Sequence, residues 1–189
     1  MNILSFGQRI EGLISTIRCA APEMTILSLA GETVFRMVEA YGRDGMRFLE
    51  QGDRINAVAS FGYASGWYKA GAFLGLVIGD LPEGNDILDE SIDTQETSRL
   101  QEKIDRYYRL LREGIAALEP APDGASILRK GAEEILLRAN SALHEGKEHR
   151  SGNQILEALR KFGYGHGWLD TGVRTGLFRI TGNRELFTI

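Results

Sequence analysis

The chain repeats itself at an offset of 101 residues, and this repeat constrains its fold more than any other feature. Residues 61–76 read FGYASGWYKAGAFLGL and residues 162–177 read FGYGHGWLDTGVRTGL, so eight of sixteen positions are identical. The match continues upstream without gaps and pairs Gly45 with Gly146. Because internal repeats mark repeated structural units, we predict a tandem duplication.

We divide the chain into a first three-helix unit at residues 1–78, an acidic linker at 79–98 and a second three-helix unit at 99–189. Nothing in the sequence is typical of a strand, so the predicted fold class is all-α. It is a tandem duplication of an antiparallel three-helix bundle with six main helices. The apolar spacing places these helices at 3–19, 22–51, 53–77, 94–118, 126–149 and 152–178.

Several residues of the kinds that begin and end helices support these limits. Pro22 suits a first helical position, Gly52 ends the second helix, and Asp53 and Ser126 are expected to cap the helices that follow them. Two further pairs are spaced as capping boxes, namely Asp93 with Glu96 and Ser151 with Gln154.

Composition restricts the classes of function. The net charge is −4, which argues against nucleic acid or an anionic membrane as a partner, and no apolar stretch is long enough to span a bilayer. The single Cys19 fits a reducing cytoplasm, and the N-terminus lacks the pattern of a signal peptide. The linker carries seven acidic residues and no basic one, and we interpret it as a solvated spacer rather than an acidic recognition tail.

The chain has 23 glycines, and many lie inside predicted helices, where each costs roughly 1 kcal/mol relative to Ala. Small residues recur every four positions at Gly62, Gly66 and Ala70, and again at Gly163, Gly167 and Thr171. We expect these strips to let neighbouring helices approach closely. The glycines are therefore not a phosphate-binding loop, and no cofactor is expected.

The last helix of each unit has two faces with large side chains, which indicates a helix sandwiched between others. The aromatic pairs Tyr63 with Trp67 and Tyr164 with Trp168 lie opposite the main apolar stripe. Two interpretations are open: burial against other helices, which we favour, or an exposed patch that binds a partner.

Two resemblances to known proteins follow from these motifs. Gly45, Phe48, Gly52, Asp53, Ala57, Phe61 and Ala64 follow the residue order of a tetratricopeptide hairpin, in which small residues on the two helices face each other. One hairpin per 101 residues does not make a tetratricopeptide solenoid.

The second resemblance is closer. Residues 162–178, FGYGHGWLDTGVRTGLF, resemble the segment Y-A-H-G-W-L-D-A-G-V-x-x-G-L of an archaeal family known as domain of unknown function 357. The resemblance covers about residues 100–178. It fits the first half more loosely, where Ser65 and Lys69 replace His and Asp. It implies a compact bundle of antiparallel helices and an archaeal source, and it implies no activity.

His166 is the residue in this motif that is best suited to bind a metal or to act as a catalyst. It shares a helix face with Asp170, and a metal site would need further ligands, for which His144, His149, Glu145 and Glu148 are the candidates. Arg160 and His166 also have the Arg-then-His spacing of helical HEPN ribonucleases. We favour a buried or half-buried histidine bonded to Asp170 over a ligand or catalyst.

The function that we expect from the sequence is non-catalytic: a cytoplasmic helical scaffold or adaptor that binds another protein through Tyr63, Trp67, Tyr164 and Trp168. No metal is expected, and a homo-oligomer is compatible with the sequence. The alternative is an enzyme, either a hydrolase or a HEPN-like ribonuclease, with His166, Asp170 and Arg160 as its candidate catalytic residues.

Overall fold

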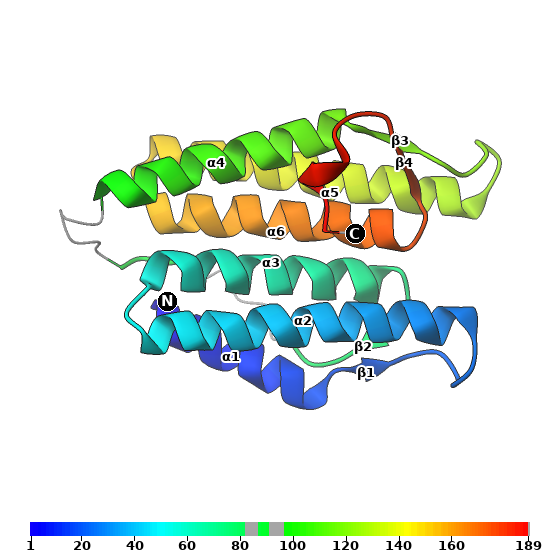
Figure 1. Cartoon of the computed structure of the whole chain (residues 1–189), viewed down its shortest axis with the longest axis horizontal. Helices are drawn as coiled ribbons and strands as arrows, with labels where there is room; N and C mark the ends of the chain where they lie inside the picture. Colours follow the sequence, from blue (N-terminus) through cyan, green and yellow to red (C-terminus); the bar gives the residue numbers. More distant parts are fainter. Residues whose placement is uncertain (82–86, 91–96, 189) are drawn as a thin grey trace.

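The computed structural model describes residues 1–81, 87–90 and 97–188. Its six long helices fall into two sets of three (Figure 1). The helices are α1 (Ile3–Thr16), α2 (Ile26–Glu50), α3 (Arg54–Phe73), α4 (Thr97–Ala116), α5 (Ile127–Ser151) and α6 (Ile155–Arg174). The predicted fold class is therefore confirmed, although the helices are shorter at most ends than predicted.

Two short antiparallel strand pairs correct the prediction that the chain has no strands. β1 (Arg18–Cys19) pairs with β2 (Val77–Ile78), and β3 (Leu118–Pro120) pairs with β4 (Phe178–Ile180). Each pair joins the end of its unit's first helix to the end of its third. Such short pairs leave no alternation of apolar and polar residues to recognise.

The helix termini confirm some predicted caps and correct others. The side chains of Asp53 and Ser126 accept hydrogen bonds from Asn56 N and Leu128 N, as predicted. Pro22 does not start a helix, because Thr25 caps α2 and the helix begins four residues later. The box of Ser151 with Gln154 is wrong, since Ser151 is still inside α5 and Gln154 makes no capping hydrogen bond. The pair at residues 93 and 96 lies outside the described residues.

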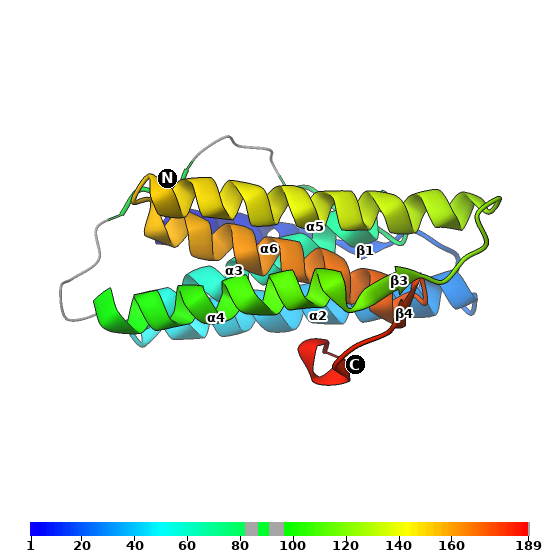
Figure 2. The ribbon, with the colours of Figure 1, turned by 90° about the horizontal axis from the view of Figure 1, so that it is seen from above.

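The two units pack against each other through α3 and α6, which run parallel (Figures 1 and 2). A Cβ added to Gly62 would lie 2.6 Å from the carbonyl oxygen of Arg160, and one added to Gly167 would lie 2.6 Å from that of Tyr63. Gly66 and Gly163 approach the opposite backbone in the same way. The predicted role of the glycine strips is confirmed, because only a missing side chain allows this backbone-to-backbone contact.

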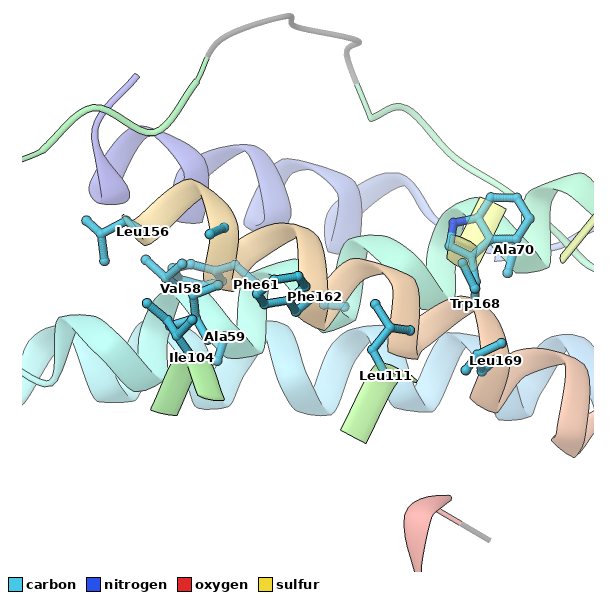
Figure 3. Close-up of a cluster of buried hydrophobic side chains, with 14 of the residues drawn as sticks. Val58, Ala59, Phe61, Ala70, Ile104, Leu111, Leu156, Phe162, Trp168 and Leu169 are labelled. Atoms are coloured by element: carbon cyan, nitrogen blue, oxygen red, sulfur yellow. The ribbon is translucent and has the colours of Figure 1, made fainter. Parts of the chain in front are cut away.

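Packing within each unit differs from the tetratricopeptide pattern. Gly45 of α2 lies against the ring of Phe61, and Gly146 of α5 lies against the ring of Phe162. The small residue thus faces an aromatic ring rather than a second small residue. Figure 3 shows Phe61 and Phe162 in one cluster of buried side chains that draws on both units.

Part of the predicted linker is packed against the helices. Leu88 is 2% exposed, and its backbone N–H donates to Glu157 Oε2 at 3.1 Å. Met1 is held beside it, because Asp89 N–H donates to the carbonyl oxygen of Met1 at 3.2 Å. The interpretation as a solvated spacer therefore does not hold for residues 87–90. Leu88, one of the few apolar residues of the acidic stretch, is the anchor.

Candidate functional site

α6 positions His166 and Asp170 one turn apart at the centre of the molecule. The Asp170 side chain is fully buried and the His166 side chain is 12% exposed. His166 Nε2 lies 3.9 Å from Asp170 Oδ2, which is too far for a hydrogen bond. The predicted half-buried histidine is confirmed, but the predicted bond between the two side chains is wrong.

Tyr63 of α3 is the partner of Asp170 instead. Its hydroxyl donates to Asp170 Oδ2, so this hydrogen bond joins the two units. Thr188 adds its backbone N–H, 3.4 Å from the same oxygen, and its hydroxyl lies 3.1 Å from Tyr63 Oη. Burial raises the pKa of Asp170 despite the opposing effects of His166 and Tyr63. Burial and then the charge of Asp170 raise the pKa of Tyr63 well above its usual range.

The His166 ring lies between two aromatic rings. The Tyr63 ring is stacked on it with centroids 6.0 Å apart, and the Phe187 ring is stacked on it at 6.3 Å, within 6° of parallel. His166 Nδ1 and Asp170 Oδ1 are buried, and neither has a hydrogen-bond partner among the described residues. Buried polar atoms without partners are uncommon in native structures, so this cluster needs an explanation.

The other candidate ligands lie elsewhere. His144 is paired with Glu148 on the surface at 3.3 Å, and His149 Nδ1 lies 2.6 Å from Gln154 Oε1. Glu145 binds Lys161. Over the described part of the chain, no group of three or more His, Cys, Asp or Glu side chains is placed to hold a metal ion.

Arg160 does not join His166. Its guanidinium binds Glu157, with Nε 2.8 Å from Oε2, and lies over the ring of Phe6 at 5.5 Å from the centroid. Glu157 is 1% exposed and also accepts the Leu88 N–H. Burial raises the pKa of Glu157, but the hydrogen bonds and charge of Arg160 outweigh this and lower it. Sequence reasoning missed Glu157, although its i,i+3 spacing from Arg160 was a usable signal.

The four aromatic residues form interior packing rather than an open surface. Trp67 is fully buried, Tyr63 and Trp168 are 6% and 4% exposed, and Tyr164 is half-buried. Trp168 packs beside Phe73 at 5.9 Å between centroids, with Ala70 nearby (Figure 3). The interpretation as burial is confirmed, and an exposed aromatic patch is not what these side chains form.

Exposed apolar residues gather instead where α2 and α5 begin. Ile26 and Leu27 are 82% and 56% exposed, and their equivalents Ile127 and Leu128 are 75% and 56% exposed. We call these two pairs the apolar tips. The loops before α2 and α5 lie at the same end of the molecule in both views (Figures 1 and 2). Exposed Met24 and Leu29 enlarge the first tip.

The apolar tips carry a signal that sequence reasoning missed. Across residues 2–56 and their equivalents, Ile26-Leu27 is the only adjacent pair of residues that the two units share. Shared residues such as Ile3 and Gly45 are buried, so packing explains their presence in both units. Packing does not explain a shared pair that lies on the surface.

Fold and site together define an all-α protein made of two fused copies of one three-helix unit, with a polar cluster buried where the copies meet. Every helix in the described residues falls short of the length or apolar character needed to cross a membrane. A family model described as protein of unknown function (DUF357) matches residues 6–77 and again residues 106–178. The chain therefore belongs to this family and carries two copies of its domain. No curated protein and no solved structure matches the chain.

Proposed function

We propose that this protein is a non-catalytic helical adaptor of the archaeal cytoplasm that binds another protein through its two apolar tips. The observation that carries the proposal is the shared, exposed Ile-Leu pair at residues 26–27 and 127–128. Single exposed apolar residues are ordinary on protein surfaces. A pair that recurs at equivalent positions with closely similar exposure favours a binding role.

The duplicated unit suggests the form of the partner. Both tips belong to helices that are packed on the shared α3–α6 core, so the distance between the tips is set by the fold. A partner with two equivalent apolar sites, such as a symmetric dimer, would engage both tips at once. Binding at two linked sites can exceed the affinity of either one by 10²–10⁴-fold, provided that the geometry permits both contacts.

An enzymatic role receives less support. Asp170 is hydrogen-bonded by Tyr63 and Thr188, and the candidates His144, His149 and Arg160 are engaged elsewhere. Within the described residues, the cluster thus offers a histidine without the third ligand that a metal-dependent hydrolase would use, and Arg160, the cation of the HEPN-like spacing, binds Glu157 instead.

The test compares a tip variant with a matched surface variant. In the tip variant, Ile26, Leu27, Ile127 and Leu128 are changed to Ser. In the control, Leu4 and Leu137 are changed to Ser, because both are exposed but neither is shared by the two units. The residues at the equivalent positions of the other unit are Asp105 and Arg36. Far-UV circular dichroism first establishes that both variants fold.

We expect the wild type and the control to retain the same protein from an extract of the native source, and the tip variant to lose it. The retained protein is then purified, and its affinity is measured with each tip changed alone. Each single-tip variant should bind at least 10-fold more weakly than the wild type. Equal binding by the tip variant would refute the proposal. So would tip-dependent binding to anionic lipid vesicles without any protein partner, which would make the tips a membrane contact.

A further inference from the structure

The two units differ at one packing position next to the buried polar cluster. Leu13 of α1 is fully buried, whereas the equivalent residue of α4 is Gly114. A Cβ added to Gly114 would lie 3.0 Å from Leu169 Cδ1, 3.6 Å from Phe187 Cε1 and 3.8 Å from His166 Cε1. The second unit therefore lacks a side chain that the first unit supplies from its own helix, and Leu169 and Phe187 together fill the space.

Phe187 belongs to a C-terminal segment, residues 181–188, that we call the strap. Figure 1 shows the strap passing across α6, and its Thr188 contacts Asp170 of α6 and Tyr63 of α3. At the start of the strap, the Thr181 N–H donates to the carbonyl oxygen of Ala117 at 2.8 Å. Residues 181–185 of the strap are exposed. Its far end is attached through the buried ring of Phe187 and the hydrogen bonds of Thr188.

The strap leaves the polar atoms beneath it incompletely satisfied. Thr188 reaches Asp170 Oδ2 only at 3.4 Å, and Oδ1 of the same carboxyl group accepts no hydrogen bond from the described residues. His166 Nδ1 is also buried and has no hydrogen-bond partner among the described residues. Because pairing a buried polar group stabilises the complex, a ligand that hydrogen-bonds these atoms would compete with the strap for this position.

We propose that Tyr63, Gly114, His166 and Asp170 form a peptide-binding site, the strap site, which the chain's own strap occupies in this structure. The external ligand is a protein segment with an aromatic residue followed by a hydrogen-bond donor, the order of Phe187 and Thr188. Its ring enters the space beside Gly114 and stacks on His166, and its donor reaches Asp170. The segment displaces the strap.

Three observations support this assignment independently of the apolar tips. The space beside Gly114 accepts a ring from a separate segment rather than from α4 itself. The His166 and Phe187 rings are within 6° of parallel, which is a defined stacking geometry. The strap site is also specific to the second unit, because Ser65, Lys69 and Leu13 replace His166, Asp170 and Gly114 in the first.

The experiment uses the full chain and a labelled peptide of residues 181–188, TGNRELFT. Phe187→Ala removes the ring of the strap and frees the site. Fluorescence polarisation should then show saturable binding of the peptide to the Phe187→Ala chain and at least 10-fold weaker binding to the wild type, whose own strap competes. A peptide with Ala in place of Phe should bind neither chain.

A second variant tests the site in the opposite direction. Gly114→Leu should place a side chain where Leu13 lies in the first unit. The flexible end of Leu169, 3.0 Å from the added Cβ, shifts to admit it, so that the strap is released and the peptide does not bind. Hydrogen exchange should show the strap amides of this variant at least 10-fold less protected than in the wild type, with α6 unchanged. In the wild type itself, the Thr188 amide should exchange at least 100-fold faster than the core amides of α6, as expected for a segment that opens locally.

Failure of the peptide to bind a folded Phe187→Ala chain would overturn the proposal, as would equal binding to the Gly114→Leu chain. Thr188 exchange as slow as that of α6 in the wild type would overturn it even if neither variant folds. None of these measurements involves the apolar tips, so the adaptor proposal stands or falls separately.

Discussion

The close backbone contact between the two units at Gly167 makes Gly167→Ala an informative single substitution. The new Cβ would lie 2.6 Å from the Tyr63 carbonyl oxygen, 2.9 Å from Trp67 N and 3.0 Å from Gly66 Cα, all of them backbone atoms. Ordinary contact begins at 3.4 Å, so α3 and α6 must separate by about 0.8 Å. A gap of this size forfeits roughly a quarter to a half of the dispersion energy of the contacts that it opens.

The expected loss of stability follows from two opposing effects. Overpacking of this kind costs about 3 kcal/mol, and the higher helix propensity of Ala returns about 1 kcal/mol. The net loss is about 2 kcal/mol, measured as a lower midpoint of urea unfolding by circular dichroism with an unchanged slope. Gly12→Ala is the matched control, because Gly12 lies inside α1 with nothing within 4 Å of the added Cβ. It should stabilise the chain by roughly 0.5–1 kcal/mol. If Gly167→Ala stabilised the chain as Gly12→Ala does, the close contact would be refuted.

Three further predictions concern buried charges and a helix cap. The lowered pKa of Glu157 stabilises the fold above the ordinary carboxyl pKa and less as pH falls through the folded value. Glu157→Gln should therefore lose less stability than the wild type between about pH 7 and pH 3 in urea titrations, and an equal loss would contradict the role of Arg160. The raised pKa of Asp170 has the opposite sign, because its contribution is present below the ordinary pKa and is lost as pH rises through the folded value. Asp170→Asn should remove a decline in stability above about pH 4, and a parallel decline in the variant would show that the burial of this charge is not its cause. Ser126→Ala should cost about 1 kcal/mol in thermal unfolding, since it removes the hydrogen bond to Leu128 N, and no change would mean that the cap is dispensable.

The helical architecture was readable from the sequence because its signals are local or repeated. The offset of 101 residues identified the two units, and Asp53 and Ser126 were recognised by cap chemistry that depends on the next three residues. The strips at Gly62 and Gly167 were predictable for another reason. Only close helix packing offsets so many glycines inside helices.

The partners of the site residues were not readable, because they come from distant parts of the chain. Asp170 is bonded by Tyr63, which is 107 positions away, rather than by His166, which is four positions away. The Leu88 N–H donates to Glu157, which is 69 positions away. The composition of the stretch around Leu88 indicated only exposure to solvent. Helical spacing tells which side chains share a face, but it does not tell what packs against that face.

The central claim is that the two units fold as one body because α3 and α6 bury each other. Each unit holds a single tryptophan, Trp67 in the first and Trp168 in the second. Urea unfolding of Trp168→Phe, followed by the fluorescence of Trp67, reports the first unit, and Trp67→Phe reports the second through Trp168. Circular dichroism of the same samples reports all six helices. We predict that fluorescence and circular dichroism give one coincident transition in each variant. Separated transitions, with one unit still folded after the other has melted, would contradict the claim.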